Sequence, residues 1–392
     1  MPAPLPELDA QYDEEPADTL LGGGSVAEKL RALHAEMRAL PLLSGIDRIA
    51  AAVYEPKEGT VKAFVHSNDG PNPLGRYTAR LDAHPGLDAV ARDGRPLVEN
   101  DLQAASRMDF KAVPLVRHGY RARCVTAVQW QGTLYGFLFF NSFQPGYFTP
   151  AVLEALRPFR RIASLMIAHE LSTLRAMLAA VRTARAMSLF RDQETGGHLE
   201  RMARYAQLIA RRLAPVRGLS DAFVEYLFQY APLHDVGKVA VPDRILLKPG
   251  RLTPEEFAVM QTHVVRGLEI VEAMQRDHGL HRLPHADLLR NVIACHHEAV
   301  DGSGYPHGLT GEAIPLEGRI TTVADVFDAL TSERPYKAAW SNAQALDYLR
   351  AHAGSKFDPA CVEALAARMD AVEAIQASFR DEPQDEPSEE AA

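Results

Sequence analysis

Apolar residues follow two different periods along this chain, and its first part mixes strand and helix patterns. Between about residues 25 and 148, short runs of β-branched and apolar residues alternate with polar turns, which is typical of β-strands. These runs are Ile46–Val53, Val61–His66, Cys124–Trp130 and Thr133–Asn141. Gln131-Gly132 joins the last two runs as a hairpin turn would, and residues 25–40 have a helical pattern. We therefore expect an α+β domain with an antiparallel sheet in this region.

A helical pattern then runs without a break from residue 150 to about 190. Thr149 can cap its start, and Pro150 follows at the first helical position, where a missing N–H costs nothing. Apolar residues recur in steps of four, three, four and three, the spacing of a coiled-coil seam. They are Ile167, Leu171, Leu174, Leu178 and Val181. We expect a linker helix that pairs two copies of the chain in a homodimer; the alternative is an apolar face packed on its own domain.

From residue 191 to about 380 the pattern is helical, with polar loops and without the alternation of a strand, so an all-α domain fits best. Both ends of the chain are polar and acidic, which favours disordered tails. The predicted fold class is a multidomain α+β protein. Its expected parts are an acidic tail (1–24), a sensor domain (25–149), a linker helix (150–190), an all-α domain (191–380) and a second acidic tail (381–392).

Composition narrows the class of protein. Hydrophobic residues make up 47% of the 392 residues, which is too many for a wholly disordered chain. The net charge of −9 argues against binding to a nucleic-acid polymer, which needs a basic face. The three cysteines include no CxxC pair and fit a reducing compartment. The apolar run at 134–140 is far shorter than the roughly 20 residues of a spanning helix, and the acidic start is unlike a signal peptide, so we expect a cytoplasmic protein without a membrane span.

The histidines are concentrated in the helical region, where eight of fifteen fall between residues 198 and 297. Among them, His234 is followed directly by Asp235. Such a pair can bind one metal ion through the imidazole while both carboxylate oxygens bridge two ions. Lys238 comes three residues after Asp235, so on a helix it returns to the same face and can hold a phosphate oxygen beside the metals. A lone His-Asp pair is more often a histidine satisfied in a core, so its neighbours decide.

Further candidate ligands occur on both sides of this pair. They are Glu194, His198, His263, His296, His297 and Asp325. A capping box at 253–256 begins a helix that is predicted to carry His263, and Asp328 is expected to support a ligand or cap a helix rather than to bind metal. Five imidazoles with several carboxylates are too many for one tetrahedral zinc. They suit six-coordinate Mn or Fe in a cluster of two or three ions.

Several long strings, in order, carry a resemblance to a known family. They are ETGGH, LHDVGKVAVPDRILLKPGRLTPEEF, HHEAVDGSGYPHGLTGEAIPLEGRI, VADVFDALTSERPYK and KFDP. Together they resemble the HD-GYP branch of the HD-superfamily phosphohydrolases, over about residues 188 to 365. The order of elements in the first domain, with the stretch LYGFLFFNSFQPGYFTP leading into a helix, resembles a GAF domain.

The HD-GYP resemblance implies roles for individual residues. The expected metal ligands are Glu194, His198, His234, Asp235, His263, His296, His297 and Asp325. Asp235 would bridge, and Glu194 would shift the expectation from two ions toward three. Lys238 would contact one substrate phosphate, while Arg334 and Lys337 would bind the other; the alternative for this last pair is an exposed helix terminus. The GYP loop (Gly304, Tyr305, Pro306) is expected to be architectural, with glycines that permit positive φ.

The reaction that the resemblance implies is hydrolysis of cyclic di-GMP to the linear dinucleotide pGpG, to GMP, or to both. His234, Asp235 and Lys238 are the residues expected to carry it. No part of the sequence reads the guanine base, so another cyclic dinucleotide stays an alternative substrate. Two other classes stay open: a catalytically weak receptor for cyclic di-GMP, and an HD phosphohydrolase that acts on another nucleotide.

Overall fold

The computed structural model describes residues 24–68, 77–106, 113–189, 196–277, 285–333 and 338–379. The chain divides into two compact units, Met1–His169 and Glu170–Ala392. Apart from Gly24, the two predicted acidic tails lie outside the described residues. The predicted domain boundaries at residues 149, 190 and 380 stay predictions.

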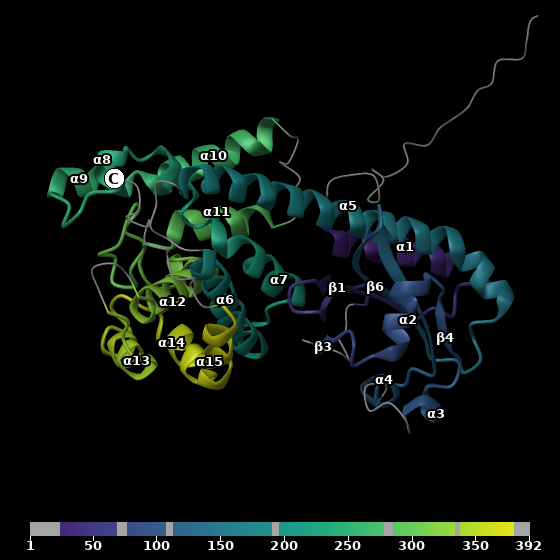
Figure 1. Ribbon diagram of the computed structural model, residues 1–392. Helices are drawn as coiled ribbons and strands as arrows, with labels where there is room; N and C mark the ends of the chain where they lie inside the picture. The colour runs from purple at the N-terminus through teal and green to yellow at the C-terminus, as the bar shows by residue number, and fades with distance from the viewer. Residues whose placement is uncertain are drawn as a thin grey trace, which may run out of the picture. The chain divides into compact units, whose positions relative to one another are not determined.

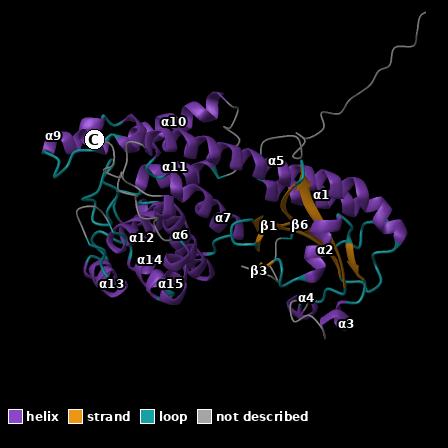
Figure 2. Ribbon diagram, viewed as in Figure 1, coloured by secondary structure: helices purple, strands orange, loops and turns teal. Residues whose placement is uncertain are grey.

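The N-terminal unit is built on one antiparallel sheet of six strands in the order β3-β2-β1-β6-β5-β4 (Figures 1 and 2). Its strands are β1 (Arg48–Glu55), β2 (Thr60–His66), β3 (Thr78–Arg80), β4 (Leu97–Glu99), β5 (Ala122–Trp130) and β6 (Thr133–Ser142). The four longer strands match the four predicted runs. Gln131 and Gly132 have φ angles of 49° and 77°, the left-handed values that a two-residue hairpin turn requires.

Both faces of this sheet are covered. Residues 48–53 of β1 are all buried, although neighbouring side chains on a strand point to opposite faces. The helices of this unit are α1 (Val26–Ala39), α2 (Pro85–Asp93), α3 (Leu102–Ser106) and α4 (Val113–Arg117). Helix α1 contacts β1 and β2, whereas α2 contacts β4 and β5. The start of α1 is fixed by a capping box between Ser25 and Glu28, which satisfies two backbone N–H groups.

The predicted linker helix is α5 (Pro150–Leu189). The hydroxyl of Thr149 accepts a hydrogen bond from the N–H of Val152, as expected of a capping residue. Three residues of the predicted seam (Ile167, Leu171 and Leu174) are buried within the single chain, which favours the alternative of an intramolecular apolar face for that part of the helix. The side chains of Leu178 and Val181 lie outside the description, and the homodimer stays a prediction.

Helices make up the C-terminal unit, and its described residues contain no strand. They are α6 (Gly196–Arg217), α7 (Asp221–Tyr230), α8 (Asp243–Leu246), α9 (Pro254–Gln261), α10 (His263–Asp277), α11 (Ala286–Cys295), α12 (Leu316–Thr331), α13 (Asn342–Ala351), α14 (Pro359–Ala366) and α15 (Met369–Ser378), with short 3₁₀ helices η1 (Ala231–Leu233), η2 (Val236–Ala240) and η4 (Gly311–Ala313). Helix α6 contacts α7, α12, α14 and α15, so it is the centre of the bundle (Figure 1). The predicted fold class, an α+β domain followed by a long helix and an all-α domain, is confirmed.

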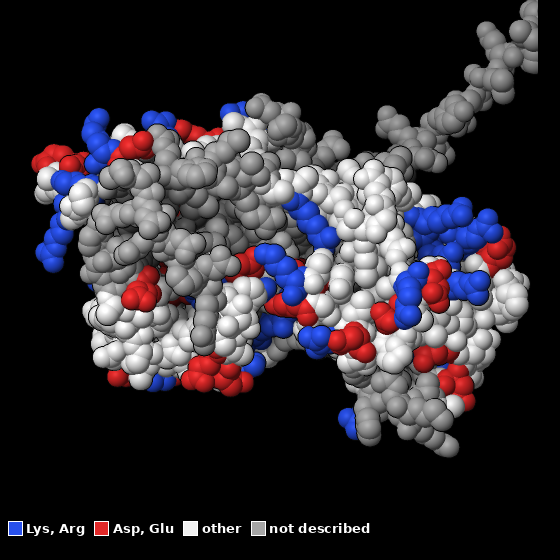
Figure 3. Space-filling view, viewed as in Figure 1, with Lys and Arg blue, Asp and Glu red and all other residues white. Residues whose placement is uncertain are grey.

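The described surface carries charges of both signs (Figure 3). On the face drawn in Figure 3, acidic and basic side chains of the described residues are interspersed rather than gathered into one broad basic field. Within the part of the chain that the structure describes, no helix has both the length and the apolar character needed to cross a membrane.

Candidate metal centre

His234 and Asp235 lie in a tight turn between η1 and η2, where both side chains are buried. The turn is 3₁₀ rather than α-helical, so residues three apart eclipse one another. Lys238 accordingly lies over Asp235, with its Nζ 2.8 Å from Oδ2 of the carboxylate. The predicted proximity of this lysine to Asp235 is therefore present, in a tighter helix than expected.

Two glycines bring this turn against α10. A Cβ atom at Gly237 would lie 1.8 Å from the carbonyl oxygen of His263 and 2.4 Å from the backbone nitrogen of Gly267. Only a residue without a side chain lets the backbones approach this closely. The close approach places Nε2 of His263 at 3.1 Å from Oδ1 of Asp235.

The prediction that the capping box begins the helix that carries His263 is wrong in one respect. The capping box is present, with Thr253 and Glu256 bonded reciprocally, but the helix it begins (α9) ends at Gln261. His263 begins the next helix, α10. The break falls at Thr262, whose hydroxyl donates a hydrogen bond to the carbonyl oxygen of Val259. Such a bond back to the preceding turn competes with the regular ladder.

The end of α11 supplies two more imidazoles. Nε2 of His296 lies 3.5 Å from Oδ1 of Asp235 and 3.4 Å from Nε2 of His263. The hydroxyl of Thr322 on α12 donates to the carbonyl oxygen of His296, which ties the end of α11 to α12. Asp235, His263, His296 and His297 thus form one group of side chains whose ligand atoms lie within 4.8 Å of one another.

A second group adjoins the first. It consists of His198 on α6, His234 in the turn and Asp325 on α12, again with ligand atoms within 4.8 Å of one another. Oδ1 of Asp325 lies 3.6 Å from Nε2 of His198 and 3.8 Å from Nε2 of His234. Because His234 and Asp235 are consecutive, one turn of chain contributes to both groups. Oδ2 of Asp235 faces His234 at 3.0 Å, while its Oδ1 faces His263.

The orientation of the imidazoles is a direct test of whether this cluster fits metal ions. In His234, His263 and His296, Nδ1 lies within 3.0 Å of a backbone carbonyl oxygen, from Ala231, Met260 and Ile293 respectively. A carbonyl can only accept, so Nδ1 must carry the proton in each ring. Nε2 is then left with a lone pair that points into the cluster, the arrangement that metal-bound histidines adopt. The residues present therefore fit a site for metal ions.

Burial also favours the protonation states that metal binding requires. Desolvation lowers the pKa of His296 and of His297, and the neighbouring imidazoles lower that of His297 further. Burial by itself would raise the pKa of Asp235, but Lys238 and His234 hold it well below the ordinary carboxyl value. At neutral pH His296 and His297 are thus neutral imidazoles and Asp235 is an ionised carboxylate, and both are ligand forms.

The sequence analysis missed Arg201, and it gave Asp328 only a supporting role. Asp328 is fully buried and accepts hydrogen bonds from Nδ1 of His198 at 2.8 Å and from Nε of Arg201 at 2.7 Å. The expectation that it supports a ligand agrees with this geometry. Arg201 carried no signal beyond its position three residues after His198. Its guanidinium also reaches the hydroxyl of Ser332 and the carbonyl of Phe379, which fixes the Asp328 carboxylate in place.

Replacing Asp328 by asparagine is expected to lower metal affinity about 10- to 100-fold, because the group that orients and polarises His198 is weakened. Equilibrium dialysis against Mn²⁺ measures this change. The matched control is Asp347→Asn on α13, whose side chain is exposed and which is expected to leave affinity unchanged. Equal affinities for the two variants would contradict the role of Asp328.

The GYP loop packs directly on the cluster. The ring of Tyr305 stacks on His297, with 4.6 Å between the ring centroids. The buried carboxylate of Glu298 accepts the backbone N–H groups of His307 and Leu309. The expected positive φ applies to Gly302 (81°) but not to Gly304, where a Cβ would instead lie 2.3 Å from the backbone nitrogen of Ala299. The loop therefore steadies His297, in line with an architectural role.

Seven of the eight predicted ligands come together in these two groups. Glu194, Arg334 and Lys337 lie outside the described residues. The third ion expected from Glu194 and the second phosphate contact expected from Arg334 and Lys337 therefore stay predictions. The ligand assignment as a whole also stays a prediction, with which the geometry of the two groups is compatible.

Comparison with known proteins shows which proteins this chain is similar to. Residues 190–361 match the family model described as an HD domain. A relative in Xanthomonas campestris, the cyclic di-GMP phosphodiesterase response regulator RpfG, is 48% identical over 198 residues, which is 50% of this chain and 49% of that protein. Two relatives from Vibrio cholerae are 3'3'-cGAMP-specific phosphodiesterase 2 (45% identical; 49% of this chain, 34% of that protein) and a cyclic di-GMP phosphodiesterase (42% identical; 54% and 43%).

The chain spans about half or less of the length of these curated relatives. The match to the HD model covers the turn with His234 and Asp235 and every helix that contributes to the two ligand groups. Residues 190–361 of this chain therefore match an HD domain, and this segment carries both ligand groups.

Proposed function

We propose that this chain is a metal-dependent phosphodiesterase that hydrolyses cyclic di-GMP to pGpG, to GMP or to both, and that the N-terminal unit regulates it. The observation that carries the proposal is the position of Asp235. One of its oxygens faces His263 and His296, while the other faces His234, so this carboxylate would be shared by the two ions that the neighbouring imidazoles would hold. Two metals held in this way suit the hydrolysis of a phosphodiester.

Each residue of the cluster has a distinct part in this proposal. When bound, divalent ions would lower the pKa of a water molecule and polarise a phosphoryl oxygen. Asp235, His263, His296 and His297 would hold one ion, and His198, His234 and Asp325 would hold the other. Lys238, whose ammonium lies at Asp235, is placed to bind an oxygen of the scissile phosphate. Arg334 and Lys337 would bind the second phosphate, and Glu194 would complete a third ion site.

The nature of the ions and of the assembly belongs to the same proposal. Imidazole and carboxylate ligands in this number suit iron or manganese, in two or three ions per chain. The three cysteines are buried and free, which supports a reducing compartment such as the cytoplasm. The helix at 150–190 would join two chains as a homodimer. Cyclic di-GMP is preferred as substrate because two of the three relatives above are named for it.

The test is turnover by the full chain, purified without oxygen and supplied with Mn²⁺ or Fe²⁺. We expect release of pGpG or GMP from cyclic di-GMP, and two or three ions per chain by elemental analysis. 3'3'-cGAMP and GTP are assayed in parallel. Faster turnover of cGAMP than of cyclic di-GMP would make cGAMP the assigned substrate, since one relative is specific for it by name. Hydrolysis of GTP alone would favour another phosphohydrolase, and tight binding of cyclic di-GMP without turnover by metal-loaded protein would favour a receptor.

A further inference from the structure

Helix α9 presents a phenylalanine ring to solvent. Among the described residues of the C-terminal unit, Phe257 is the one phenylalanine, tyrosine or tryptophan that is exposed, at 47%. An aromatic side chain ordinarily stabilises a fold by being buried, yet α9 buries none of its residues. The ring of Phe257 therefore adds little to the core and is left available to a ligand.

The local structure fixes where this ring lies. Phe257 is in the first turn of α9, and its backbone N–H donates to the carbonyl oxygen of Thr253 at 2.8 Å. The neighbouring Glu256 closes the capping box and also forms an ion pair with Lys248. A ring carried by an anchored turn of helix has little freedom to lose when a flat ligand binds, so the contact is pre-organised.

A row of rings connects Phe257 with the metal centre. Tyr305 stacks on His297, and its ring centroid lies 6.4 Å from that of His263 and 6.2 Å from that of Phe257. The rings of Tyr305 and Phe257 are inclined by 82°, so the two are in edge contact rather than stacked. His297 and Tyr305 are half-buried, whereas Phe257 is exposed. The row thus leads from a candidate ligand outward to solvent.

The open side of the metal centre is the side on which this row begins. Of the seven grouped ligands, only His297 and Asp325 are half-buried, and Lys238 beside them is half-buried as well. A substrate phosphate would enter from this side, because protein covers the other ligands. The part of the substrate that is attached to the phosphate would then lie along Tyr305 toward Phe257.

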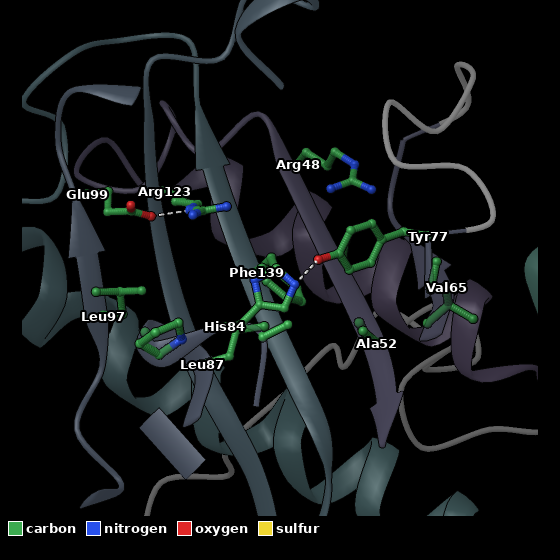
Figure 4. A pocket seen from close by; sticks show the side chains of 16 residues that line it. Arg48, Ala52, Val65, Tyr77, His84, Leu87, Leu97, Glu99, Arg123 and Phe139 are labelled. Carbon is green, nitrogen blue, oxygen red and sulfur yellow. Dashed lines mark hydrogen bonds and ion pairs between the residues drawn. The ribbon is translucent and has the colours of Figure 1, made fainter. Parts of the chain in front are cut away.

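The largest apolar cavity of the N-terminal unit offers no alternative at the metal centre. Figure 4 shows this cavity of about 400 Å³, whose walls include Leu87 and Phe139. Every residue that lines it belongs to the N-terminal unit, and none of them is a candidate metal ligand. The row of rings, in contrast, starts at a ligand. Phe257 is therefore the aromatic side chain best placed to hold a group attached to a metal-bound phosphate.

We propose that Phe257 stacks on a base of the substrate nucleotide while the phosphate lies at the metal centre. The inference rests on the proposed function and adds to it a residue that holds a base. Every nucleobase has a flat π face, and stacking on an aromatic ring does not read the edge of the base. Phe257 would thus favour nucleotides over phosphates without a base, and it would not distinguish guanine from adenine.

The test is isothermal titration calorimetry of the full chain, loaded with Mn²⁺, against GMP and against inorganic phosphate. Both probes bring a phosphate to the metal centre, but only GMP brings a base. We expect GMP to bind at least about fivefold more tightly, which corresponds to one stacked base. Phe257→Leu keeps an apolar side chain without the ring, so it should remove the preference for GMP and leave phosphate affinity unchanged. Phe257→Tyr should restore the preference.

The control and a kinetic readout use the same helix. Val259 is also exposed and lies two residues further along α9, on roughly the opposite side, so Val259→Ala should keep the preference for GMP. With cyclic di-GMP as substrate, Phe257→Leu should raise KM about fivefold or more and leave kcat within about twofold. A ring that binds the base equally well before and during the reaction changes KM alone.

The outcomes separate this inference from the proposed function. No binding of GMP, equal affinities of the parent chain for GMP and phosphate, or a preference for GMP that survives in Phe257→Leu would overturn the stacking. Loss of phosphate affinity in Phe257→Leu would also refute it, because the ring would then support the metal centre itself. A parent chain that prefers GMP through Phe257 but hydrolyses no cyclic dinucleotide would uphold the stacking and refute the proposed phosphodiesterase activity.

Discussion

In the proposed phosphodiesterase, replacing Asp235 by asparagine is expected to lower the rate of cyclic di-GMP hydrolysis by roughly a thousandfold or more, while the domain stays helical. The carboxylate has one oxygen toward each ligand group, and an amide offers only one acceptor oxygen, so it cannot bridge two cations. Metal assistance contributes several kcal/mol to such reactions, and each 1.4 kcal/mol or so is tenfold in rate. The turnover number, measured together with metal content and circular dichroism, checks this result.

A carboxylate elsewhere in the domain provides the control for Asp235. Asp287 lies in the first turn of α11 with its side chain exposed, so Asp287→Asn makes the same chemical change away from the cluster. It is expected to keep turnover within about twofold of the parent, because exposed substitutions of this kind change little. Near-normal turnover by metal-loaded Asp235→Asn would contradict the site assignment.

Replacing Gly237 by alanine is expected to lower the free energy of unfolding of the C-terminal unit by about 3 kcal/mol or more and to abolish metal binding. The new methyl group would meet two backbone atoms, the carbonyl oxygen of His263 and the nitrogen of Gly267, and neither can rotate away. The turn with His234 and Asp235 would have to move off α10, which separates Asp235 from His263. Denaturant unfolding and Mn²⁺ dialysis measure the two effects.

The control for Gly237 lies two residues further along the same 3₁₀ helix. Val239 is exposed, so Val239→Ala should change the free energy of unfolding by no more than about 0.5 kcal/mol and keep metal binding. An unfolding midpoint of Gly237→Ala equal to that of the control would mean that the close approach of the two backbones is not required.

Periodicity made most of the fold predictable, and its limits explain what was missed. The longer strands and α5 have enough residues for a repeat to stand out. The Gln131-Gly132 turn located the ends of two strands, and the Thr149 cap located the start of α5. Strands β3 and β4 have three residues each, too few for an alternation to be visible. Their presence in the sheet follows from pairing with β2 and β5, which is tertiary information.

The candidate site was predictable to the extent that its residue types are unusual. Adjacent His-Asp and His-His pairs are rare enough to attract attention. The remaining ligands were candidates by residue type, and the resemblance implied the role of each. Arg201 was missed because an arginine on a helix is ordinarily an exposed residue, and only its contact with Asp328, 127 positions away, makes it part of the site. Gly237 is part of a quoted motif, but the sequence did not show why glycine is needed there. The reason is that the backbone of α10 leaves no room for a Cβ atom.

The way in which the histidines are held implies an order of assembly. His234, His263 and His296 each bond a carbonyl three residues earlier in the chain, so a single turn suffices to aim each ring. His198 instead takes its aim from Asp328, 130 positions away, and thus only after α6 has docked on α12. The rings of His263 and His296, on the half of the centre with Asp235, are consequently oriented by their own turns of chain. The orientation of His198 depends on the packing of α6 against α12, so a loosening of α6 would disturb His198 before the other imidazoles.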